Sequence, residues 1–195
     1  MILKPPPSAR RPYPMLQRGF TLVELLAVMA VTAILIAVGI PQLSQFSASR
    51  AANSHVAMLA SALRLARSEA VRSGTPVTVC PSFNAESAVR PDCNGGANDW
   101  ASGWVIFTDL GVLNVIEPGD RIIRVQGPIQ DSGGIQSQGG ASINFFPTGI
   151  SLGGQRSFSF LPLISPSSPS YNDTAQRMCV DNIGSTIRRK YSEAC

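Results

Sequence analysis

The sequence predicts an α+β fold in which a long N-terminal helix packs on an antiparallel β-sheet. Three features of the chain predict it. An apolar stretch of helix length covers residues 21–40, an apolar stripe with helical spacing covers residues 52–70, and short β-type runs separated by Gly, Pro, Asn and Ser follow Gly74. The chain has 195 residues, of which 44% are hydrophobic, enough to form a core and to exclude wholesale disorder.

Residues 1–19 are expected to be a basic leader. They contain Lys4, Arg10, Arg11 and Arg18, no acidic residue and five prolines, so neither a compact helix nor a strand is expected. The whole chain has 16 basic and 12 acidic residues, which leaves 12 of each after the leader. The net charge of +4 therefore belongs to the leader. It predicts a cytoplasmic N-terminus and an exported C-terminal domain.

Residues 20–41 are expected to be a transmembrane helix. Between Thr21 and Ile40 the one ionisable residue is Glu24, and a helix of this length spans about 30 Å, the thickness of the hydrocarbon core. A secretory signal that is removed has a shorter apolar stretch, so an uncleaved anchor is favoured. A carboxylate in lipid costs on the order of 3 kcal/mol. Glu24 therefore lies near the headgroups or pairs with a cation.

Residues 42–74 predict an amphipathic continuation of the helix, because apolar residues recur every three or four positions: Ala52, Val56, Leu59, Leu63, Ala66 and Ala70. Four arginines lie off this stripe, at Arg50, Arg64, Arg67 and Arg72. Gly74 and Pro76 predict the end of the helix. His55, the single histidine, is expected in a solvated or half-buried structural role.

Residues 75–195 predict a β-rich domain with one antiparallel sheet whose covered face meets the helix stripe. The expected strands are 77–80, 104–108, 121–126, 142–146, 157–161, 177–180 and 186–189. The composition of residues 82–102, 127–141 and 162–175 predicts loops.

The sequence predicts neither an enzyme nor a cofactor or metal site. It has no second histidine, nucleophile elbow or phosphate-binding loop. Its four cysteines lack any C-x-x-C pair, which disfavours zinc. Asp92 and Asp99 flank Asn94-Gly95-Gly96 and are interpreted as turn residues, because their spacing matches no calcium loop.

The run Arg18-Gly19-Phe20-Thr21-Leu22-Val23-Glu24-Leu25-Leu26 resembles the processing motif of type IV pilins and type II secretion pseudopilins. The resemblance implies that a prepilin peptidase cuts between Gly19 and Phe20 and methylates the new amino group of Phe20. It also implies that Glu24 meets the Phe20 ammonium of a neighbouring subunit in the filament. A buried carboxylate is tolerated when a cation neutralises it. Pro41 also matches, since many members have a proline there that kinks or melts the helix.

The rest of the chain most resembles the H-type minor pseudopilins and the FimT/FimU-type minor pilins (the GspH/FimT family). Three stretches carry this resemblance, residues 66–80, 99–109 and 143–149. It implies a minor pilin or pseudopilin that is anchored by a single span in the bacterial inner membrane, has a periplasmic domain and joins a filament. Its partners would be other minor and major subunits and the prepilin peptidase. The motif does not distinguish a type IV pilus from a type II secretion pseudopilus.

The four cysteines are expected to form two disulfides in an oxidising compartment, with three connectivities possible. Short local loops and the resemblance favour Cys80–Cys93 and Cys179–Cys195, each contributing about 3 kcal/mol in the chain-entropy model.

The C-terminal run Arg188-Arg189-Lys190-Tyr191 gives an alternative function, DNA binding in DNA uptake. Cations bind phosphates and an aromatic ring stacks on bases. Some FimT-type minor pilins serve DNA uptake, and the resemblance implies a Gly-Arg-x-Arg motif. Here Gly184 is followed by Ser185, and the cations come four residues after the glycine. A solvated charge cluster is the other interpretation, and the neutral chain after the leader favours it.

Overall fold

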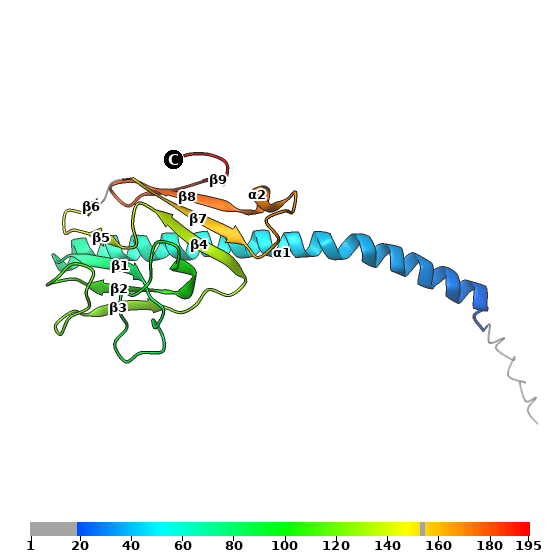
Figure 1. The fold of residues 1–195 in the computed structure, drawn as a ribbon, viewed down its shortest axis with the longest axis horizontal. Coiled ribbons are helices and arrows are strands. Elements are labelled where there is room, and N and C mark those ends of the chain that lie inside the picture. The colour runs from blue at the N-terminus through cyan, green and yellow to red at the C-terminus, as the bar shows by residue number, and fades with distance from the viewer. Residues whose placement is uncertain (1–18, 153–154) are drawn as a thin grey trace, which may run out of the picture. The chain divides into compact units, whose positions relative to one another are not determined.

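The computed structural model describes residues 19–152 and 155–195, so the expected leader lies outside the described residues except for Gly19. The chain divides into two units, Met1–Ile40 and Pro41–Cys195. The expected α+β class is confirmed (Figure 1). The elements are α1 (Leu22–Ser73), β1 (Val77–Pro81), a 3-10 turn (Trp100–Ser102), β2 (Trp104–Thr108), β3 (Ile122–Gln126), β4 (Ser132–Gln138), β5 (Ile143–Phe145), β6 (Ser151–Leu152), β7 (Arg156–Pro162), α2 (Tyr171–Thr174), β8 (Gln176–Val180) and β9 (Thr186–Lys190).

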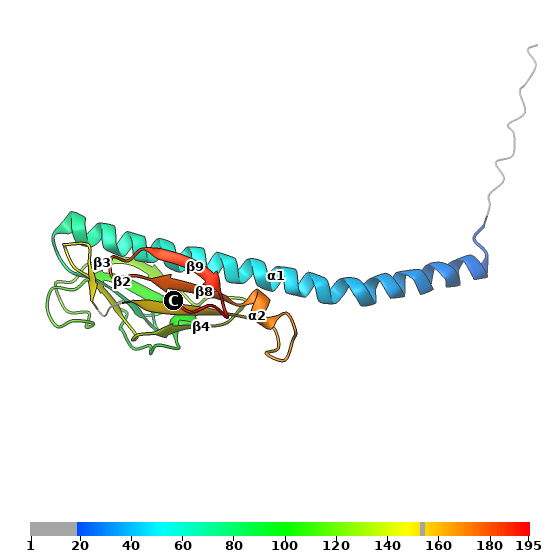
Figure 2. The ribbon, with the colours of Figure 1, turned by 90° about the horizontal axis from the view of Figure 1, so that it is seen from above.

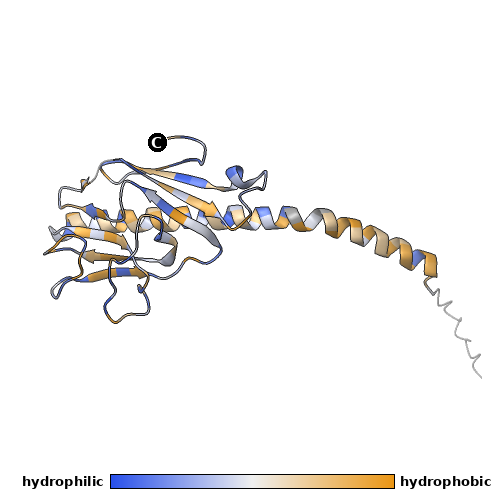
Figure 3. Cartoon of the chain, in the orientation of Figure 1, coloured by the Kyte–Doolittle hydropathy of each residue, from blue (hydrophilic) through white to orange (hydrophobic). Residues whose placement is uncertain are grey.

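The first unit is the apolar N-terminal part of α1 (Figure 3). Its most apolar stretch of 18 residues contains no buried residue. Among the described residues, α1 is the one helix that is long and apolar enough to cross a membrane. Large side chains such as Phe20 and Leu22 are exposed. Exposed apolar surface of this extent is typical of a segment that contacts lipid or other helices.

The second unit begins with the rest of α1, whose backbone is helical at Pro41. The predicted stripe is buried: Ala52, Val56, Leu59, Leu63, Ala66 and Ala70 are each at most 4% exposed. The helix ends at Ser73 because Gly74 adopts a left-handed φ of +68° and donates its N–H to the Ala70 carbonyl. The expected helix end at Gly74 is therefore confirmed.

The prediction of one sheet is wrong, because the strands form two antiparallel sheets. One has the order β3-β2-β1-β5-β6 and the other the order β4-β7-β8-β9 (Figure 1). The helix stripe and both sheets contribute to one core, in which the Trp100 ring meets Phe158 edge-on at 5.0 Å. Trp104, Ile106 and Phe107 are buried, as their motif predicted. The buried Arg156 guanidinium also links the sheets by donating to the carbonyls of Ser142 and Leu152.

The seven predicted strands all form, and each end agrees within one residue. The prediction that residues 127–141 form a loop is wrong, because β4 pairs there with β7. Its Ser-Gly-Gly-Ile-Gln-Ser-Gln composition has low strand propensity, yet Ile135 is fully buried. Gly133 permits this pairing, because a Cβ there would collide with the Pro162 carbonyl oxygen. The short strand β6 and the four-residue helix α2 were not predicted either.

Candidate functional site

The predicted processing and assembly residues lie at the start of α1. Gly19 and Phe20 are exposed and precede the helix, so the peptide bond between them lies outside regular structure. Thr21 is the N-cap residue, and its Oγ1 accepts the backbone N–H of Glu24 at 3.2 Å. The Thr-x-x-Glu spacing is that of a capping box, so it could have predicted this cap from the sequence. The carboxylate of Glu24 has no partner among the described residues.

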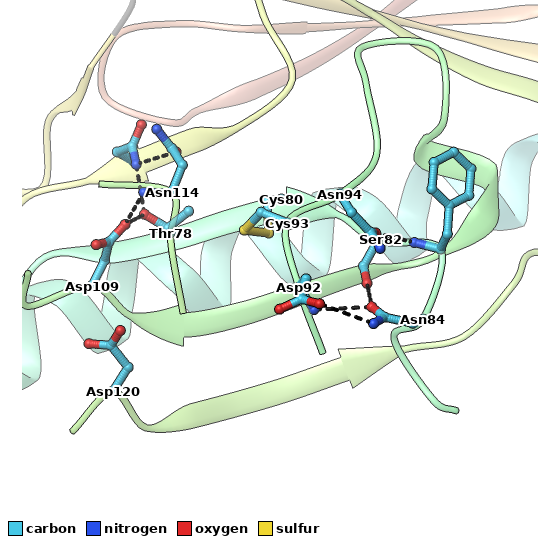
Figure 4. The surroundings of a disulfide bond; sticks show 12 residues. Thr78, Cys80, Ser82, Asn84, Asp92, Cys93, Asn94, Asp109, Asn114 and Asp120 are labelled. Atoms are coloured by element: carbon cyan, nitrogen blue, oxygen red, sulfur yellow. Dashed lines mark hydrogen bonds between the residues drawn. A yellow bond between two sulfur atoms is a disulfide. The ribbon is translucent and has the colours of Figure 1, made fainter. Parts of the chain in front are cut away.

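The disulfide between Cys80 and Cys93 is confirmed and ties β1 to the long loop before β2 (Figure 4). Beside it, Asn84 Oδ1 accepts the backbone N–H of Asp92 at 3.0 Å. The carboxylate of Asp99 accepts the N–H of Gly96 at 2.8 Å. The Asp99 carboxylate therefore holds a turn, whereas at Asp92 the side chain of Asn84 holds the backbone. In the described parts of the chain, no group of three or more His, Cys, Asp or Glu side chains could hold a metal ion.

The second disulfide joins Cys179 of β8 to Cys195. The C-terminal segment between β9 and Cys195 is also held by hydrogen bonds. Arg177 donates to the Glu193 carbonyl at 2.8 Å, and its guanidinium lies 5.3 Å from the Tyr191 ring centre. These contacts lie on the face of the sheet opposite α1, because Met178, the alternate residue of β8, points into the core.

The predicted cation run does not form one patch, because Arg188, Arg189 and Lys190 belong to strand β9. Side chains alternate between the faces of a strand. Arg188 pairs with Met178 and donates to Asn53 of α1 at 3.1 Å, so it points toward the helix. Arg189 points to the other face, where it lies 3.9 Å from Glu193. DNA binding through this run stays a prediction, with its cations divided between two faces.

A polar cluster that the sequence did not predict joins β1, β5 and the loop after β2, with Thr78, Asp109 and Asn144 buried and Asn114 exposed (Figure 4). Thr78 donates to Asp109 Oδ2 at 2.6 Å, and the same oxygen accepts the N–H of Asn114 at 2.8 Å. Asn144 donates to both Thr78 Oγ1 and Asn114 Oδ1. These residues are far apart in the sequence, and their pairing depends on the register of β1 with β5. The cluster fixes the loop onto the sheet.

Two ionisable residues of α1 also contact the β-rich part. His55 is 7% exposed, so it is buried rather than solvated, and burial lowers its pKa although Gln130 and Asp131 oppose the shift. The carboxylate of Glu69 binds Arg72 at 2.6 Å and Arg121 at 3.1 Å. Hydrogen bonds from these two arginines lower the pKa of Glu69. Glu69 therefore connects the end of α1 to the residue before β3.

Comparisons with known proteins agree with this architecture. Residues 55–184 match the family model of the type II transport protein GspH, and residues 14–40 match that of the prokaryotic N-terminal methylation motif. No curated protein matches the chain.

Three solved structures are similar to this chain. The type IV minor pilin FimU of Pseudomonas aeruginosa gives a TM-score of 0.54 at 16% identity, over 77% of this chain and 96% of that one. A second crystal form of FimU gives 0.50 at 16% identity, over 73% and 96%. The minor pseudopilin EpsH of Vibrio cholerae gives 0.45 at 12% identity, over 73% and 98%. The FimU likeness supports the fold.

Proposed function

This chain belongs to the GspH family and is a structural subunit of a type IV pilus or a type II secretion pseudopilus, and we propose that it acts by assembly through the apolar part of α1. The observation that carries this proposal is the exposed apolar start of α1, which lies within the residues that match the methylation motif. Such a helix is stable in lipid before assembly and against other apolar helices afterwards. The basic leader would hold the N-terminus in the cytoplasm, so the β-rich part would lie in the periplasm.

Processing creates the charge that the apolar helix requires. A prepilin peptidase would hydrolyse the bond between Gly19 and Phe20 and methylate the new amine, which leaves a cation four residues before Glu24. In a bundle of apolar helices, the Glu24 carboxylate of one subunit would pair with the Phe20 ammonium of its neighbour. Pairing offsets much of the cost of placing either charge in an apolar medium. The Thr21 cap begins the helix here, which holds Glu24 on its first turn.

The substitution Glu24→Gln tests this proposal, because it keeps the shape of the side chain and removes its charge. We expect normal membrane insertion and folding but much reduced recovery of the subunit in sheared filaments. Glu86→Gln is the matched control, since it removes one exposed carboxylate from the β-rich part. Wild-type incorporation of the Glu24 variant would refute the charge-pairing role. Deleting the protein and observing which filament is lost distinguishes a pilus from a pseudopilus.

A further inference from the structure

A groove runs between the C-terminal half of α1 and the start of β9. Its lining residues are Arg64, Arg67, Ser68 and Val71 on the helix and Gly184, Ser185 and Thr186 on the other side, and its volume is about 700 Å³. Figure 2 shows β9 alongside this part of α1, and the hydrogen bond from Arg188 to Asn53 confirms that they are neighbours. We call this feature the α1–β9 groove.

The two cations that line the α1–β9 groove, Arg64 and Arg67, lack carboxylate partners in the described part of the chain, and so does Arg188 of the neighbouring strand β9. Among the described residues, no acidic side chain lies within 4 Å of Arg64, Arg67 or Arg188. By contrast, Arg72 and Arg121 share the carboxylate of Glu69. The groove therefore presents positive charge that the described chain does not neutralise.

The groove also borders an open sheet edge. In the described chain β9 pairs with β8 on one side and with no strand on the other. Alternate residues of an edge strand direct their backbone N–H and C=O groups away from the sheet, where they can pair with an added strand. Lys190 and Arg188 lie on the helix-facing side of β9, as their pairing with Gln176 and Met178 shows. Alternate side chains of an added strand would therefore lie beside these two cations and face α1.

We propose that the α1–β9 groove binds an extended acidic segment of another filament subunit, which adds to β9 as a further strand. Its backbone would pair with the free edge of β9, and its helix-facing carboxylates would meet Arg64, Arg67 and Arg188. This mode of recognition takes affinity from the backbone ladder and specificity from alternate side chains. The inference rests on the proposed function, because a filament supplies neighbouring subunits.

A peptide segment fits the groove better than DNA does. The edge of β9 offers a repeating row of backbone donors and acceptors, which a peptide strand matches and a phosphate backbone does not. The segment Ser82–Asp120 contains six acidic residues and one basic residue, Arg90, so this part of the chain carries negative charge that repels a polyanion, while residues 20–195 as a whole have 12 of each sign. Polyanion binding is therefore the outcome against which the proposal is tested.

The test uses the full chain in detergent and a fluorescent eight-residue peptide of alternating Asp and Thr. We expect saturable binding by anisotropy and slower amide hydrogen exchange in β9. Arg64→Gln with Arg67→Gln should weaken binding by at least about tenfold, because each loses a charge-assisted hydrogen bond. Arg90→Gln with Arg124→Gln is the control, since it removes the same charge outside the groove. Two further peptides are methylated on alternate backbone nitrogens, one at the odd positions and the other at the even positions. We expect one of the two to lose binding, because its methyl groups replace the N–H groups that would pair with β9.

Each other outcome overturns the proposal. Equal binding of the two methylated peptides would exclude strand addition. Equally tight binding of the original peptide and of one with Lys in place of Asp would exclude charge recognition. If a DNA oligonucleotide bound more tightly than the peptide, and Arg64→Gln weakened that binding, the groove would be assigned to a polyanion. Self-association that the paired glutamine substitutions abolish would assign it to a second copy of this chain. Incorporation of the Glu24 variant tests the filament role separately, so the two failures are distinguishable.

Discussion

The Thr78 hydroxyl donates a 2.6 Å hydrogen bond to Oδ2 of Asp109, a residue that is 2% exposed. This bond joins the second residue of β1 to the first residue after β2. The other carboxylate oxygen of Asp109 has no partner among the described residues. A buried carboxylate is costly unless it is hydrogen-bonded, so the position of the loop after β2 depends on these few donors.

Thr78→Val should therefore destabilise the protein although it preserves the side-chain volume. The substitution removes one donor from a buried carboxylate, and we expect a loss of about 2 kcal/mol in the free energy of unfolding. Urea denaturation of the full chain in detergent measures it. Thr148→Val, at an exposed threonine, is the control and should change the stability little. Equal effects of the two substitutions would contradict a structural role for the Thr78–Asp109 bond.

Leu63→Ala should be among the most destabilising substitutions in α1. Leu63 is fully buried where the helix stripe meets both sheets, so truncation removes apolar contacts and leaves a cavity. We expect a loss of about 3 to 4 kcal/mol, measured by the same denaturation. Leu163→Ala makes the same chemical change at a side chain that is 63% exposed, and it should cost less than about 0.5 kcal/mol. A small effect at Leu63 would show that the helix does not close this core.

The stability of the β-rich part should fall as the pH is lowered below 6.5, the ordinary pKa of histidine. Burial lowers the pKa of His55 in the folded protein, so below pH 6.5 the unfolded chain binds more protons than the folded chain. Linkage then makes folding weaker as the pH falls toward the folded-state pKa. The carbonyl of Gln130 and the charge of Asp131 reduce this effect without reversing it.

His55→Gln should flatten the pH dependence of stability between pH 7 and about 5, a range that lies above the titration of ordinary carboxylates. Denaturation midpoints measured at several pH values provide the comparison with the wild type. An unchanged slope would mean that other groups cause the acid sensitivity.

Residue periodicity was sufficient to predict the helix stripe and the seven strands, because apolar residues at 3.6-residue or two-residue spacing identify buried faces. It could not predict β4, since Gly133 takes part through close backbone approach rather than through its own propensity. Nor could it show that β9 places Arg188 and Arg189 on opposite faces of a sheet edge. Three adjacent cations can form one patch in a loop, whereas in a strand they are divided between its two faces. The groove beside β9 could not be predicted either, because Arg67 and Thr186, which both line it, are far apart in the sequence.

Gly19→Ala should block processing without disturbing the fold. No heavy atom of the described chain beyond the adjacent residues lies within 4 Å of a Cβ added at Gly19, and the residue precedes the helix. We would therefore attribute a loss of cleavage to recognition by the proposed peptidase rather than to misfolding. The 195-residue chain has a mass of 20.7 kDa, so the uncut precursor would be heavier than the cleaved protein by about 2 kDa, the mass of 19 residues.

Gly39→Ala is the control, because a Cβ there also meets no neighbour and the residue lies inside α1. Immunoblots should show the heavier band for Gly19→Ala alone. If both variants migrated like the wild type, the cleavage site would lie elsewhere or cleavage would not occur. The functional protein could then retain the four basic residues of the leader, and the balance of 12 basic and 12 acidic residues would not apply to it.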